Sequence, residues 1–162
     1  MAKKQKPAGS VGAYDAALKY LTPKARTVRE VELKLDEGCY SEGEIMLVIE
    51  RLTDAGLLND EKYARDFVSS RLSTKPVSAF RLREQLRGHH VPEDIIDEAL
   101  GEVGEDTEFN NAVEVARKYL RQFGAIEDET ERLRRVYTRL QTRGYAHDTI
   151  MKALREAADG EQ

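Results

Sequence analysis

Four arginines recur at helical spacing near the end of the chain, and their side chains are the clearest candidates for binding a partner. They are separated by three, four and four residues, which places them on one stripe of a helix. The stripe flanks an apolar face of Leu133, Val136 and Leu140. A row of guanidinium groups binds phosphates or an acidic protein groove, or forms a solvated face neutralised by Glu and Asp. The four residues are Arg132, Arg135, Arg139 and Arg143.

An earlier segment carries cations at matching positions. In that segment Arg83 and Arg87 share one helix face, and Arg81 lies beside them. In the internal repeat described below, Arg81 corresponds to Arg135 and His89 corresponds to Arg143. Aromatic residues are not interleaved with these cations, so a platform that stacks single-stranded bases is not expected. We predict a discontinuous basic contact surface made of Arg81, Arg83, Arg87, Arg132, Arg135, Arg139 and Arg143.

The sequence lacks the patterns of common catalytic and cofactor sites. It has no Gly-rich phosphate loop, no dinucleotide fingerprint, no His-Glu-x-x-His and no Cys-x-x-Cys. His89 and His90 are adjacent, so they point to different sides of a helix and make a poor metal pair. Asp60, Glu61 and Asp66 resemble a carboxylate cluster, but capping of a helix N-terminus explains the first two better. We therefore expect no catalytic residue, no cofactor and no metal.

The composition limits the class of protein and its compartment. The single cysteine, Cys39, excludes an internal disulfide and fits a reducing cytoplasm. No segment approaches the roughly eighteen apolar residues of a membrane-spanning helix. The net charge of −4 excludes a positive field over the whole protein, so strong non-specific DNA binding is not expected. We expect a cytoplasmic protein.

The candidate side chains must be positioned by an internal repeat. A Leu is followed after four residues by a second apolar residue, after four more by an Ile, and after three more by an aliphatic residue. The Leu is expected to end one helix, the next apolar residue to pack the turn, and the last two to lie one turn apart on the following helix. The three copies are Leu35-Tyr40-Ile45-Ile49, Leu86-Val91-Ile96-Leu100 and Leu140-Tyr145-Ile150-Leu154.

Capping signals surround each copy and predict its helices. Thr27 and Ser41 each begin a capping box, Ser78 can cap a helix, and Pro92 is expected at the first position of the next helix. No segment alternates as a strand does. The sequence therefore predicts an all-α, elongated tandem array of three three-helix modules, with a helix-turn-helix look to the last two helices of each. The expected parts are a disordered basic tail (1–10), module 1 (11–56), module 2 (57–101), an acidic connector (102–106), module 3 (107–157) and a frayed tail (158–162).

The stretch from Leu58 to Arg71 resembles the signature of the bacterial regulatory protein RecX family, roughly Leu-x-Asp-x-x-[Tyr/Phe]-Ala-x-x-[Phe/Tyr]-x-x-x-Arg. Ala17-Leu18-Lys19-Tyr20-Leu21 and Leu140-Gln141-Thr142-Arg143-Gly144-Tyr145 are similar to two further family features. One departure is His89-His90-Val91, where many members have Lys-Gly-Ile, so either the histidine is strained or the turn differs. The signature positions, which we expect to be mostly structural, are Leu58, Asp60, Tyr63, Ala64, Phe67 and Arg71.

The resemblance implies a non-enzymatic modulator of the RecA recombinase. Family members bind RecA and its nucleoprotein filament on DNA, and they mainly inhibit its activities in recombination, DNA repair and the SOS response. We therefore expect a monomer that binds and restrains the RecA filament, with at most weak DNA contact. The first alternative is a direct DNA-binding regulator of helix-turn-helix type, which the acidic pI disfavours. The second is a scaffold for another protein, in which the basic stripes only solvate the helices.

Overall fold

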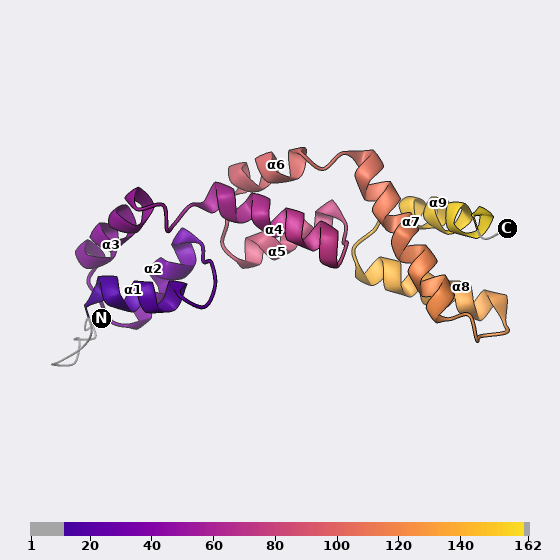
Figure 1. Ribbon diagram of the computed structural model, residues 1–162, viewed down its shortest axis with the longest axis horizontal. Helices are drawn as coiled ribbons and strands as arrows, with labels where there is room; N and C mark the ends of the chain where they lie inside the picture. Colours follow the sequence, from indigo (N-terminus) through magenta and orange to yellow (C-terminus); the bar gives the residue numbers. More distant parts are fainter. Residues whose placement is uncertain (1–11, 161–162) are drawn as a thin grey trace.

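The computed structural model describes residues 12–160, and in this range the chain forms nine α-helices and no strand (Figure 1). Helices α1–α3 make module 1, α4–α6 make module 2, and α7–α9 make module 3. The helices are α1 (Ala13–Leu21), α2 (Val28–Glu37), α3 (Glu42–Asp54), α4 (Asp60–Thr74), α5 (Ala79–Gly88), α6 (Glu93–Gly101), α7 (Glu105–Gln122), α8 (Glu129–Thr142) and α9 (His147–Asp159).

The helix starts follow from side chains that satisfy free backbone N–H groups. Both predicted capping boxes are present, one with Thr27 before α2 and one with Ser41 before α3. Ser78 caps α5 by accepting a hydrogen bond from the Arg81 amide. Pro92 differs from the prediction, because it is the N-cap of α6 and the helix begins one residue later.

Each module has its own apolar core, and the repeat lies at the centre of it. Leu35, Leu86 and Leu140 are at most 1% exposed, and they belong to three separate clusters of buried residues. Ile96 and Ile150 are fully buried on the following helix, whereas Ile45 is only partly buried. The well-packed helix pairs all join helices of the same module. The joints between modules therefore contribute little apolar burial.

The turn after the repeated Leu has the same geometry in all three copies. Cys39, His90 and Gly144 occupy equivalent positions and all have positive φ, at 63°, 60° and 85°. The amide of the next residue donates back to the Leu carbonyl each time, as from Val91 to Leu86 at 3.1 Å. The departure from the family pattern therefore leaves the turn unchanged and places a histidine in the left-handed region. His90 is exposed, which gives its side chain room there.

The three modules follow one another in a row from the N-terminal to the C-terminal end of the molecule (Figure 1). This arrangement confirms the prediction of an elongated all-α array. Leu58 packs into the core of module 1 and Val103 against that of module 2, so the cores extend past the expected boundaries. The predicted basic tail lies outside the described residues. Within residues 12–160, no helix is long and apolar enough to cross a membrane.

Candidate partner-binding surface and module joints

The seven arginines predicted as a contact surface do not form one surface. Arg83 contacts Glu93 at 2.9 Å and Asp97 at 2.7 Å, and Arg87 also pairs with Glu93. The hydrogen bond from Arg87 is the main reason that the pKa of Glu93 is lowered, although slight desolvation opposes it. Both arginines therefore connect α5 to α6 within module 2. This agrees with the alternative interpretation of the arginines as a solvated helix face that is neutralised by Glu and Asp.

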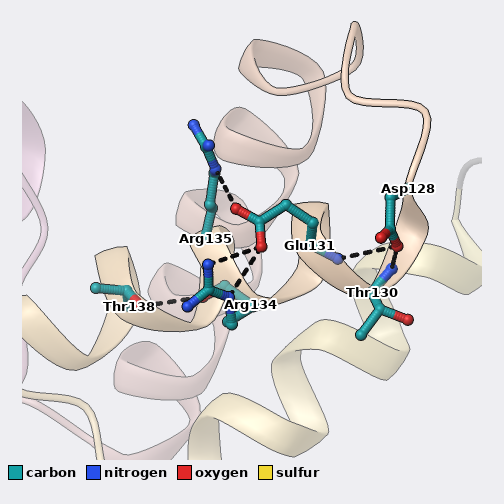
Figure 2. Close-up of polar contacts among 6 residues, drawn as sticks. All are labelled: Asp128, Thr130, Glu131, Arg134, Arg135 and Thr138. Carbon is teal, nitrogen blue, oxygen red and sulfur yellow. Dashed lines mark hydrogen bonds and ion pairs between the residues drawn. The ribbon is translucent and has the colours of Figure 1, made fainter.

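The exposed part of the predicted stripe is on α8. Glu131 lies between two arginines and accepts from Arg134 at 2.7 Å and from Arg135 at 2.8 Å (Figure 2). Arg139 is exposed, and its guanidinium lies 5.7 Å from the centroid of the Tyr119 ring. Arg132 is half-buried, and its Nε has no hydrogen-bond partner among the described residues. Arg134 is not part of the predicted stripe, but it is exposed and adjacent to it.

Arg143 is buried rather than presented to a partner, which corrects the prediction for this residue. It is 8% exposed. Its Nη1 donates to the Pro76 carbonyl at 2.7 Å, and its Nη2 donates to the Tyr119 hydroxyl at 3.2 Å. The hydrogen bond from Arg143 lowers the pKa of Tyr119. Helical spacing places Arg143 on the stripe, but module 2 covers that end of it.

The joint between modules 2 and 3 is built from helix ends. The Ser78 amide donates to the Arg143 carbonyl at 3.0 Å, and Arg81 donates to the Thr142 carbonyl at 3.1 Å. The Ala79 amide, at the start of α5, donates to the Glu108 carboxylate of α7 at 3.2 Å. Free N–H groups at one helix N-terminus thus meet a carboxylate and the last carbonyls of another helix.

The joint between modules 1 and 2 uses the same positions. The Thr27 hydroxyl donates to the His89 carbonyl at 2.7 Å, and the Val28 amide donates to the Asp60 carboxylate at 2.9 Å. His89 also contacts the Glu30 carboxylate through Nδ1 at 2.8 Å. His89 and Arg143, which correspond in the repeat, therefore both accept a hydrogen bond across a joint through their backbone carbonyls. Asp60 serves this joint, while Asn59 caps α4.

The remaining signature residues lie in or beside the core of module 2. Ala64 is fully buried, and the rings of Tyr63 and Phe67 stack with centroids 6.2 Å apart. Both rings also meet the His89 imidazole edge-on, at 5.8 and 5.5 Å. Arg71 lies over the Phe67 ring at 5.3 Å.

A basic cleft, here called the joint cleft, lies where modules 2 and 3 meet. Its volume is about 190 Å³, and it contains no Asp or Glu among its lining residues. Three of its cations, Arg81, Arg139 and Arg143, belong to the predicted contact surface, whereas Arg71, Lys75 and Tyr119 do not. The spacing of Arg71 and Lys75, four residues apart on one helix, was the available signal. The lining residues are Arg71, Lys75, Val77, Arg81, Gln85, Tyr119, Arg139, Thr142 and Arg143.

Three successive three-helix modules with repeated polar joints define an all-helical modular repeat protein. Comparison with known families matches each module separately: the first three-helix domain of RecX to residues 13–52, the second to 59–100 and the third to 106–154. The chain belongs to the RecX family, whose relatives are named regulatory proteins.

The similarity to individual relatives extends over most of this chain and most of each relative. The chain is 33% identical to "Regulatory protein RecX" of Prosthecochloris aestuarii, covering 89% of this chain and 92% of the relative. It is 34% identical to that of Halorhodospira halophila, covering 94% and 91%. The crystal structure of RecX from Lactobacillus salivarius superposes with a TM-score of 0.76 at 26% identity, over 90% of this chain and 94% of that one.

Proposed function

We propose that this chain binds the RecA recombinase and its nucleoprotein filament and restrains their activity. The observation that carries the proposal is family membership over all three modules, from residue 13 to residue 154. An elongated array also suits a partner with a long repeating surface, because successive modules can contact successive subunits. The function is regulatory, and binding rather than chemistry is what the modules supply.

The direct test is steady-state ATP hydrolysis by the RecA of the same host on single-stranded DNA, with and without this protein. We expect the hydrolysis rate to fall as the protein is added toward the concentration of RecA. An unchanged rate at a several-fold excess, together with no binding to preformed filaments in co-sedimentation, would overturn the proposal.

The exposed arginines of α8 are the proposed contacts with the filament. Arg135 and Arg139 are both exposed on α8. Replacing both with Glu should weaken filament inhibition at unchanged fold. A matched control makes the same charge change on α9, with Lys152→Glu and Arg155→Glu, which are also exposed. Equal inhibition by both double variants would remove α8 from the contact surface.

We also propose that the protein acts as a monomer. Thr27 and Ser78 are N-caps, so the amides after them are free to bind the next module. The equivalent position in module 3 is Arg132, which lies inside α8 because this helix begins at Glu129. A second copy of the chain therefore finds no free helix start at residue 132. Sedimentation equilibrium should give 18.4 kDa, and a stable dimer mass would contradict the proposal.

A further inference from the structure

The joint cleft is lined by five cations, and three of them have no acidic partner in the described part of the chain, whereas Arg81 pairs with Glu84 at 2.9 Å. Arg71, Lys75 and Arg139 form no ion pair with any residue of the described part of the chain. By contrast, Arg83 and Arg87 on the same helix as Arg81 are both paired with Glu93. A protein with net charge −4 thus keeps this cleft free of carboxylates. Close like charges repel, so a bound anion would lower the electrostatic energy of the joint.

The side chains that surround the cleft come from both modules and are held in place. Arg143 is fixed by the Pro76 carbonyl and the Tyr119 hydroxyl, and Arg81 by the Thr142 carbonyl. The Arg139 guanidinium lies about equally far from the rings of Tyr119 and Phe123, which stack with centroids 5.8 Å apart. Guanidinium groups positioned in this way bind the oxygens of phosphate as a planar fork.

The size of the cleft and its surroundings favour one phosphate of a longer strand. At about 190 Å³ it is smaller than the roughly 300–1,000 Å³ of sites that enclose a whole small molecule. Arg139 also lines a second hollow on α8, together with Arg134, Arg135 and Phe123. Cations therefore continue from the cleft along α8, as the evenly spaced charges of a nucleic-acid backbone require.

We propose that the joint cleft binds a phosphodiester group of a nucleic-acid strand, and that the bound phosphate ties module 2 to module 3. Arg71, Lys75 and Arg81 hold it from module 2, and Arg139 holds it from module 3. The second hollow takes a neighbouring phosphate by competing with Glu131 for Arg134 and Arg135, whose ion pairs are exposed and weak (Figure 2). The proposal does not depend on RecA, because the site is complete within this chain.

Binding of a fluorescent oligothymidylate, followed by anisotropy at several salt concentrations, tests the site. The variant carries Arg71→Gln, Lys75→Gln and Arg139→Gln, and the control carries Lys62→Gln, Lys152→Gln and Arg155→Gln, which removes the same charge from exposed sites elsewhere. We expect the first variant to bind at least about tenfold more weakly, with a salt slope smaller by one to two units. The control should keep most of the affinity.

Three results would overturn the proposal. The first is unchanged affinity and slope in the cleft variant while its helical circular dichroism and melting match the unaltered protein. The second is an equal loss in the control, which would mean that overall charge alone is responsible. The third is displacement of the oligonucleotide by poly-glutamate at equal charge concentration, which would assign the cleft to an acidic protein surface.

The link between the modules has its own readout. The Ser78 amide donates across the joint to the Arg143 carbonyl, so its hydrogen exchange reports how often the joint opens. A saturating oligonucleotide should slow this exchange several-fold while leaving the Val28 amide, in the other joint, unchanged. No change at Ser78 in the bound protein would contradict the proposed tie between modules.

Discussion

The Ser78 amide, at the start of α5, is hydrogen-bonded at 3.0 Å to the Arg143 carbonyl, at the end of α8. In the preceding joint the Thr27 hydroxyl reaches the carbonyl of His89, which occupies the position of Arg143. The repeat therefore includes the contacts between modules as well as their cores. Because little apolar surface is buried there, these joints depend on hydrogen bonds, and single substitutions should affect them measurably.

Replacing Arg143 with Met should destabilise the protein. The change removes two hydrogen bonds from a charged guanidinium, to the partly buried Pro76 carbonyl and Tyr119 hydroxyl, and a hydrogen bond to a charged group contributes about 1.5–3 kcal/mol. We expect the free energy of unfolding, measured with urea, to fall by about 2 kcal/mol. The control is Arg139→Met, an exposed site, where a change within about 0.5 kcal/mol is expected. Equal values for the two variants would argue against a structural role for Arg143.

Gly144→Ala should cost more than Gly56→Ala. Both glycines have positive φ, at 85° and 73°, so each substitution carries a backbone penalty of about 1 kcal/mol. A Cβ at residue 144 would lie 2.5 Å from the Ser78 Oγ, whereas one at residue 56 would meet no described atom within 4 Å. The difference in urea stability between the variants therefore measures the clash at the joint. Equal losses of unfolding free energy in the two variants would show that the joint accommodates the added Cβ without strain.

Thr27 has two roles that its substitutions can separate. Its hydroxyl oxygen accepts from the Glu30 amide at 3.2 Å, and its hydroxyl hydrogen goes to the His89 carbonyl at 2.7 Å. Thr27→Val keeps the shape but removes both bonds, so we expect a loss of about 2 kcal/mol from the cap and the joint together. Thr27→Ser keeps the hydroxyl and should lose less than half as much. Thermal denaturation followed by circular dichroism compares the two.

Asp60→Asn should be tolerated better than Asp60→Ala. Burial raises the pKa of Asp60 and the nearby Glu30 and Glu32 raise it further, while the Val28 amide lowers it. The ionised carboxylate is therefore held less favourably in the folded protein than in the unfolded chain at neutral pH. Asn keeps an oxygen for the Val28 amide and removes the charge, whereas Ala leaves that amide without its partner. Urea unfolding at pH 7 should rank Asn above Ala, and the opposite order would contradict this account.

Glu30 should make stability sensitive to acid. Burial raises the pKa of Glu30. Hydrogen bonds from His89 and the Thr27 amide, together with the charges of His89 and Arg26, outweigh this effect, so the net pKa is below that of an ordinary glutamate. Such a group stabilises the fold above its unfolded pKa of about 4.3, and this contribution is lost as pH falls through the lower folded value. Glu30→Gln should flatten the stability profile in that window. An unchanged profile would mean that Glu30 is not coupled to folding.

The sequence alone determined the helices, the module cores and the family. Leu35, Leu86 and Leu140 are buried as their spacing predicts, because the helical period sets which side chains share a face and local caps set where helices begin. The same period placed Arg143 on a stripe with Arg139, but it carries no information about which end of that stripe another module covers. Asp60 meets Val28, and Glu108 meets Ala79, across about thirty residues of chain, and Arg71 lines a cleft with Arg139 of another module. Only the tertiary structure decides these pairings, because they depend on how whole modules dock and not on the pattern within any one helix.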